Sequence, residues 1–246
     1  MPMKKVEVQT PDGAAEGELY IPTGKGPWTG VTMYTDILGI RPGSQEMARR
    51  LAEAGYVVLL PNLFYRGSKM PIFPFAPAFG EEKTMARVGE LRKSLTPDAM
   101  MRDVAAHADF LFAQAEVKKY KLGAVGYCMG GNLALRAAAA SPAKVGAAAS
   151  FHGSNLVTGA PDSPHLLAPG IKAHLYFGFA VEDKTMPPEA VAKLRAALDA
   201  ANVSYEGETY EGARHGWMVP DHPMYNAPQS DRAWKKTLSF LHATLR

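Results

Sequence analysis

A single cysteine, Cys128, has the sequence surroundings of a catalytic nucleophile. It lies within Gly-Tyr-Cys-Met-Gly-Gly at 126–131, between an apolar run at 122–125 and an Ala- and Leu-rich stretch at 132–140. The apolar run predicts a buried strand, and the Ala- and Leu-rich stretch predicts a helix. The sharp turn that joins them needs small residues on both sides of the cysteine. The helix N-terminus would direct its free N–H groups at the sulfur and favour the thiolate. We therefore expect a nucleophile here, the alternative being a small buried apolar residue.

A cysteine nucleophile needs a histidine that holds the thiolate and protonates the leaving group, and an acid that orients the imidazole. His215 lies in a glycine-flanked loop directly after the last predicted strand, 203–210, and is our candidate base. The acid should follow the preceding strand, where Glu182 and Asp183 are available, and we favour Asp183 because its loop position ordinarily carries the acid. The alternative role of Asp183 is to cap the next helix. Five other histidines are weaker candidates because they lie in predicted helices, a strand or proline-rich loops: His107, His242, His174, His165 and His222.

The negative charge that develops on a carbonyl oxygen during acyl transfer needs two N–H donors. Met129, the residue after the nucleophile, is one candidate, and Ile37, in the loop after the predicted strand 30–35, is the other. Asp36 precedes Ile37 and places a carboxylate near the same spot. It could be the partner of the resting thiol, or it could only cap its turn.

The predicted elements alternate between strands and helices from about residue 29 onward. Before that point, 6–10 and 16–21 flank Pro-Asp-Gly and predict an antiparallel hairpin. The later strands are expected at 30–35, 56–60, 122–126, 145–151, 171–177 and 203–210, and the helices at 45–54, 98–118, 132–140, 188–201 and 228–245. This alternation predicts one α/β domain over 1–246, with a mostly parallel central sheet, helices on both faces and reactive groups at the carboxyl ends of the strands.

The segment at about 65–97 is too long for an ordinary connection between a strand and a helix. Its first half is rich in Phe, Pro and Met, which predicts a cap over a substrate pocket. The alternative is a surface loop fixed by its own aromatic side chains. We expect an apolar pocket in which the substrate contacts Phe73, Phe75, Tyr127 and Trp217.

Composition excludes several classes of partner. The 246 residues carry a net charge of only +3, without a basic block, so neither nucleic acid nor an anionic membrane is expected to bind. We expect no signal peptide, because the start lacks an apolar stretch of that length, and no membrane-spanning segment. A lone cysteine excludes an internal disulfide and suits the reducing cytoplasm.

With these residues in place, the chain resembles the dienelactone hydrolase family. The likeness runs through nearly the whole chain and is carried by Asp183 and by the segments 36–40, 55–64, 126–131, 150–153 and 213–216. The family implies an α/β-hydrolase fold and a cytoplasmic hydrolase, monomeric or loosely dimeric, without cofactor or metal. It also implies a Cys128, Asp183 and His215 triad, with Ile37 and Met129 as oxyanion donors.

The chain departs from the family pattern at two places. Family members usually carry Glu at the position of Asp36, and they grip the substrate carboxylate with arginines, one of them just beyond the catalytic histidine. Here 216–220 contains no arginine, although the cap offers Arg66, Arg87 or Arg92.

The sequence therefore predicts hydrolysis of a small ester or lactone through a cysteinyl thioester, with neutral substrates preferred over the anionic dienelactone. A thiol sensor or binding protein that keeps the fold without turnover is the alternative. A peptidase is a weaker possibility.

Overall fold

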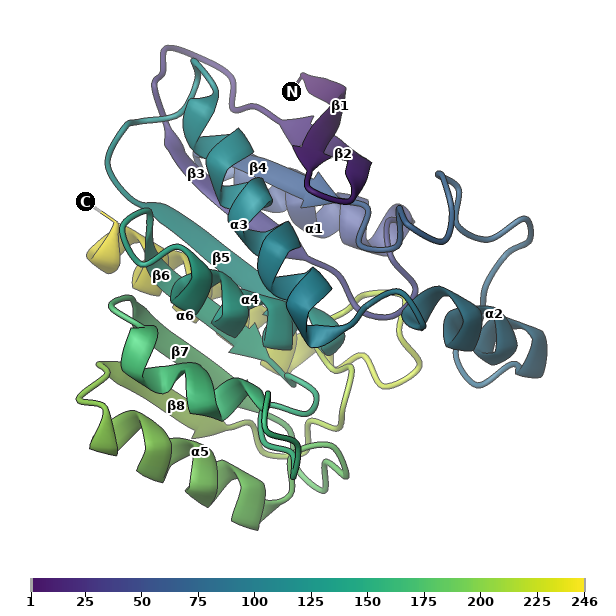
Figure 1. The fold of residues 1–246 in the computed structure, drawn as a ribbon, viewed down its shortest axis with the longest axis vertical. Helices are drawn as coiled ribbons and strands as arrows, with labels where there is room; N and C mark the ends of the chain where they lie inside the picture. The colour runs from purple at the N-terminus through teal and green to yellow at the C-terminus, as the bar shows by residue number, and fades with distance from the viewer. Residues whose placement is uncertain (1, 246) are drawn as a thin grey trace.

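The computed structural model describes residues 2–245 and is built on an eight-stranded sheet with the order β1-β2-β4-β3-β5-β6-β7-β8 (Figure 1). The strands are β1 (Met3–Thr10), β2 (Gly13–Tyr20), β3 (Thr29–Tyr34), β4 (Tyr56–Pro61), β5 (Leu122–Tyr127), β6 (Val145–Phe151), β7 (His174–Phe179) and β8 (Tyr205–Thr209). β1 and β2 form the antiparallel hairpin, and β2 also runs antiparallel to β4. Every other neighbouring pair is parallel, which confirms the predicted mostly parallel sheet.

Helices cover both faces of the sheet, as predicted. One layer contains α3 (Pro97–Ala113), α4 (Met129–Ala140) and α5 (Pro188–Ala200), and the other contains α1 (Pro42–Glu53) and α6 (Ala227–Thr244) (Figure 1). Side chains alternate across each strand, so that in β5 Ala124 packs in the first layer and Val125 in the second. The sheet therefore separates two apolar cores. The loops at its carboxyl edge lie outside both cores and can hold reactive side chains.

Some predicted boundaries move because a competing contact ends the element. The helix expected to reach 118 ends at Ala113, since the next residues return along the sheet and exchange backbone hydrogen bonds with Trp28. The strand expected from 171 begins at His174, because the short 3-10 helix η1 (Pro164–Gly170) closes with a hydrogen bond from the Ile171 amide.

The segment 65–97 leaves the carboxyl edge of the sheet and contains a helix, α2 (Glu82–Arg92), that the sequence analysis did not predict. Figure 1 shows α2 projecting to one side of the sheet. Its buried residues, Thr84, Val88 and Leu91, follow the three- and four-residue spacing of a helix face. The base of the segment is anchored by Arg66, whose guanidinium binds Asp103 at 2.7 Å.

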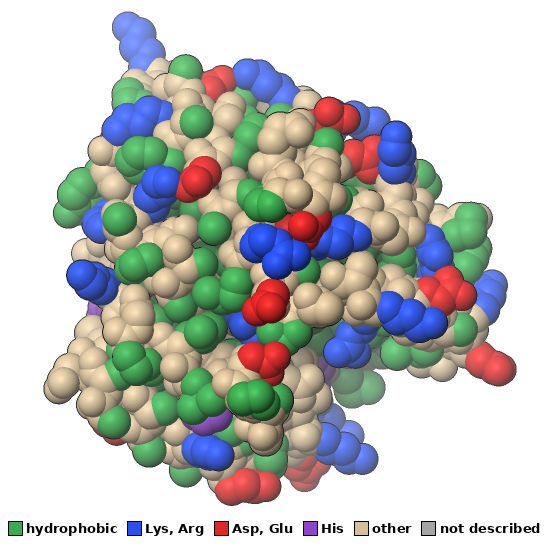
Figure 2. All heavy atoms as spheres, in the orientation of Figure 1, with side chains coloured by type: hydrophobic (Ala, Val, Ile, Leu, Met, Phe, Trp, Pro, Cys, Tyr) green, Lys and Arg blue, Asp and Glu red, His purple; other side chains and the backbone are tan. Residues whose placement is uncertain are grey.

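Charged side chains of both signs are interspersed over the face shown in Figure 2, in keeping with the small net charge. Between residues 2 and 245, no helix is both long enough and apolar enough to span a lipid bilayer.

Candidate active site

Cys128 lies at a strained turn between β5 and α4. Its backbone has φ 55° and ψ −119°, a conformation that residues other than glycine rarely adopt. The turn closes only because glycines flank it: a Cβ on Gly126 would overlap the carbonyl of Gly130, and a Cβ on Gly130 would overlap the carbonyl of Tyr34. This tight turn therefore fixes the thiol at the carboxyl edge of the sheet, at the start of α4.

His215 and Asp183 meet beside this turn, each from the loop that follows its own strand. His215 Nδ1 lies 2.7 Å from Asp183 Oδ2, and the Asp183 side chain is 2% exposed. The Thr185 amide and hydroxyl both donate to the other Asp183 oxygen, so the carboxylate is held in place. Glu182, the rival acid, is instead exposed and faces Arg214.

The charges of this pair are set by their surroundings. Burial lowers the pKa of His215, but its contacts with Asp183 and Cys128 outweigh burial and raise that pKa to about 10. Burial raises the pKa of Asp183, yet the hydrogen bonds from His215 and Thr185 prevail and leave it below its ordinary value. These contacts favour a protonated imidazole beside an ionised carboxylate.

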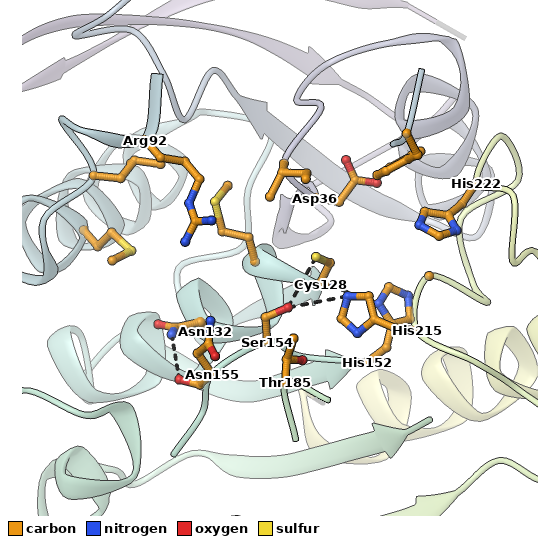
Figure 3. A pocket seen from close by; sticks show the side chains of 16 residues that line it. Asp36, Arg92, Cys128, Asn132, His152, Ser154, Asn155, Thr185, His215 and His222 are labelled. Atoms are coloured by element: carbon orange, nitrogen blue, oxygen red, sulfur yellow. Dashed lines mark hydrogen bonds between the residues drawn. The ribbon is translucent and has the colours of Figure 1, made fainter. Parts of the chain in front are cut away.

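Besides its contact with His215, the sulfur has a hydrogen-bond partner that the sequence analysis did not identify, Ser154. Cys128 Sγ lies 3.4 Å from Ser154 Oγ, and this oxygen lies 3.5 Å from His215 Nε2 (Figure 3). Ser154 follows β6 directly after the Ser-Phe-His-Gly segment at 150–153. That segment and the rule that reactive groups follow strands were the only signals pointing to this loop.

Met129 and Ile37, the two residues predicted to donate to an oxyanion, both lie beside the nucleophile. Met129 is the first residue of α4, and Ile37 belongs to the loop after β3, which the close approach of Gly130 to the backbones of Tyr34 and Thr35 brings against α4. Both residues line the pocket beside Cys128. Among residues 2–245, neither amide has a hydrogen-bond acceptor, so both are available to a substrate oxygen.

Asp36 lines the same pocket, but its carboxylate forms an ion pair with Arg41. The two guanidinium N–H groups donate to its two oxygens at 2.7 and 2.8 Å, and the Leu38 amide donates to Oδ1 at 2.9 Å. The expectation that Asp36 is the partner of the resting thiol is therefore wrong for this state, in which it binds an arginine and caps its turn. Sequence spacing did not reveal the pairing because Arg41 is oriented by Asp221, which is distant in the chain.

His152 lies beneath the nucleophile and is fully buried. Its Nδ1 accepts a hydrogen bond from the Cys128 amide at 3.1 Å, which leaves the proton of the neutral ring on Nε2. Burial, with the nearby His215 and His222, holds the pKa of His152 well below its ordinary value. His152 is therefore a neutral support for the turn and not a rival base.

The pocket over these groups has a volume of about 310 Å³. Its apolar wall comes from the cap, from α3 and from the two amide-bearing residues: Phe79, Leu95, Met100, Ile37 and Met129. Its polar lining includes Asn132, Asn155, Thr185, His222 and Arg92. Arg92, the last residue of α2, extends into the pocket (Figure 3), whereas Arg66 binds Asp103 and Arg87 binds Glu90.

Four residues expected at the pocket lie elsewhere. Tyr127 and Trp217 are buried in the core on the α1 and α6 side of the sheet, because strand alternation places Tyr127 on the face opposite Cys128. Phe73 and Phe75 line a separate groove with Leu38. The cap covers the pocket through Phe79 and Leu95 instead, so these four expectations are corrected.

Known proteins resemble this chain over most of its length. A Synechocystis sp. protein provisionally named a carboxymethylenebutenolidase is 27% identical over 94% of this chain and 92% of its own length. The carboxymethylenebutenolidase of Rhodococcus opacus is 27% identical over 87% of this chain and 81% of its own.

The fold also matches solved structures. A Klebsiella pneumoniae structure provisionally described as a dienelactone hydrolase superposes with a TM-score of 0.85, covering 98% of both chains at 21% identity, a level that shows the α/β-hydrolase fold alone. The model of the dienelactone hydrolase family matches residues 15–245. This chain belongs to the dienelactone hydrolase family.

Proposed function

We propose that this hydrolase cleaves a carboxylic ester or lactone through a thioester on Cys128. The observation that carries the proposal is the set of groups around one sulfur: a thiol on a strained backbone, the His215–Asp183 pair at 2.7 Å, and two amides that have no acceptor among residues 2–245. Nucleophile, base, orienting acid and oxyanion donors are the complete requirement for acyl transfer without a cofactor. Turnover in two half-reactions follows from this set.

In the first half-reaction, the thiolate attacks the carbonyl carbon, and the Met129 and Ile37 amides stabilise the negative oxygen. The carbon–oxygen bond to the leaving group then breaks, and His215 Nε2 gives its proton to the departing alkoxide. Asp183 balances the imidazolium until that transfer. The product is a neutral thioester beside a neutral imidazole.

The second half-reaction depends on the charge that acylation removes. Cys128 helps to raise the pKa of His215, and a thioester sulfur carries no negative charge, so acylation lowers that pKa. His215 can then accept a proton from water as the water oxygen attacks the thioester. The carbon–sulfur bond breaks, the acid leaves, and the thiolate–imidazolium pair is restored.

The pocket supports a small substrate with an acidic group remote from the scissile bond. A volume of about 310 Å³ fits a compact acyl or lactone ring, and Arg92 supplies a guanidinium at the cap side. A guanidinium binds a carboxylate through paired hydrogen bonds. This placement revises the expectation of a preference for neutral esters, which assumed that no cap arginine reaches the pocket.

The decisive experiment compares turnover with a single burst. The wild type should release many equivalents of p-nitrophenol from p-nitrophenyl acetate, and quenching with a slow ester should leave one acyl adduct on the Cys128 peptide. Cys128→Ala should lose turnover and adduct together while its circular dichroism is unchanged. Release of one equivalent only would favour a thiol-binding protein, and an active Cys128→Ala would exclude this mechanism.

A reactive thiolate that must stay reduced is suited to the cytoplasm, and we propose that location for this protein. From the family resemblance and the small net charge without a basic block, we further propose a monomer or a loose homodimer that acts on a small molecule, without nucleic acid or membrane as a partner.

A further inference from the structure

A hydroxyl group lies beside both the nucleophile and its base, which also contact each other. Ser154 Oγ is within hydrogen-bond distance of both Cys128 Sγ, at 3.4 Å, and His215 Nε2, at 3.5 Å (Figure 3). A serine hydroxyl has one proton to donate and lone pairs to accept, so it can serve both neighbours at once. None of the steps described above assigns it a part.

The position of Ser154 is fixed by the backbone around it. Its own amide donates to the Cys128 carbonyl at 3.0 Å, and the next amide, of Asn155, donates to the Thr185 carbonyl at 3.3 Å. His152 and Asn155 on either side both have positive φ, 38° and 53°, which bends the chain sharply at this point. The hydroxyl is thus tied to the elbow and to the Asp183 loop, and it is held beside the sulfur.

We propose that Ser154 is a further catalytic residue, whose hydroxyl accepts from His215 Nε2–H and donates to the Cys128 thiolate. This inference rests on the proposed function and adds to it the group that stabilises the resting ion pair. A hydrogen bond from a hydroxyl to a charged acceptor is stronger than one between neutral groups, so the contact favours thiolate over thiol. The serine gains and loses no proton over the cycle, because its hydroxyl only accepts one hydrogen bond, from His215, and donates another, to Cys128.

The other charged and titratable groups near the sulfur do not replace this contact. Asp36 is bound by Arg41 in the β3–α1 loop, Asp183 lies behind the imidazole, and His152 is neutral. The remaining groups that line the pocket are Arg92 on α2 and His222 in the loop before α6. Burial is the main cause that lowers the pKa of His222.

The test is the pH dependence of Cys128 alkylation by iodoacetamide, which measures thiolate without any ester. Ser154→Ala should raise the midpoint of the alkylation profile by about one to two pH units, the equivalent of one hydrogen bond to a charged group. Ser154→Thr keeps a hydroxyl and should restore the wild-type midpoint. A midpoint in Ser154→Ala equal to that of the wild type would overturn the inference.

Two controls separate this role from a structural one. Ser94→Ala deletes a serine hydroxyl that donates to the Leu91 carbonyl, away from the sulfur, and should leave the midpoint unchanged. The kcat/KM of Ser154→Ala should fall most at acid pH and approach the wild-type value near pH 9, whereas a packing defect would lower it equally at every pH. If the midpoint moves but no ester turns over, the proposed function fails and the role of Ser154 in holding the thiolate stands.

Discussion

At the scale of single residues, chemistry depends on loops that follow parallel strands. Cys128, Asp183 and His215 each lie in the connection that follows a predicted strand, so their meeting could be expected from the sequence. Ser154 also follows a strand, but serine is common in loops and nothing in its spacing distinguishes it. Asp36 does line the pocket, but its partner was mispredicted for a related reason, since Arg41 is itself held by Asp221 from another part of the chain. Sequence order predicts which loops converge but not which side chains pair within them.

The proton on His215 gives a residue-scale prediction. Because Asp183 helps to raise the pKa of His215 to about 10, kcat/KM should decline on the alkaline side near that pH, where the acid for the leaving group is lost. Asp183→Asn removes the negative charge and should move this alkaline limb down by about one to three pH units. The measurement is kcat/KM against pH with a lactone substrate, after subtraction of the Cys128→Ala rate.

Glu182→Gln is the matched control, because it neutralises the adjacent carboxylate, which faces Arg214 and not His215. Its alkaline limb should coincide with that of the wild type. Equal limbs in Asp183→Asn and the wild type would show that Asp183 does not set the charge of the imidazole.

At the scale of elements, the strands were predicted more closely than the cap. A buried strand such as β6 is one apolar run and was predicted at its observed bounds, 145–151. The helix α2 was missed because it carries charged residues on most of its surface and buries only a narrow face. Without that helix, the sequence could not show that Arg92 reaches the pocket while Phe73 and Phe75 turn away from it.

The position of Arg92 at the end of α2 predicts substrate selectivity. Arg92→Gln should raise the KM for an ester with a distal carboxylate about tenfold or more and leave kcat and neutral esters little changed, because a charge-assisted pair contributes about 1.5–3 kcal/mol. Matched ester pairs that differ only in the carboxylate provide the measurement. Lys93→Gln removes the neighbouring exposed charge and should change neither KM. An equal loss on both esters would assign Arg92 to the structure of the cap.

At the scale of the whole molecule, the alternation of strands and helices determined the architecture, and the two cores on either side of the sheet followed from it. The composition of these cores could not be predicted in full, because they also enclose polar groups. His107 is such a case: it lies on α3, is 1% exposed, and its ring is near Tyr34, with 5.8 Å between centroids. Neither ring nitrogen has a hydrogen-bond partner among residues 2–245.

This buried histidine predicts how the stability of the whole protein depends on acid. Burial lowers the pKa of His107 to about 4, whereas the unfolded chain takes up the proton near pH 6.5. The unfolded state therefore binds more protons between those values, and the free energy of unfolding should fall as pH falls from 6.5 to 4. The contribution of His107 amounts to about 3 kcal/mol at the acid end. Urea unfolding of the wild type and His107→Leu at several pH values measures it.

In His107→Leu the free energy of unfolding should depend less on pH between 6.5 and 4, because leucine takes up no proton on unfolding. His152 is buried too and shifts the same way, so the difference between the two proteins, and not the wild-type slope alone, isolates His107. His242→Leu, at an exposed position on α6, should keep the wild-type slope. A slope in His107→Leu as steep as that of the wild type would mean that His107 becomes protonated without unfolding the core, through water that reaches its ring.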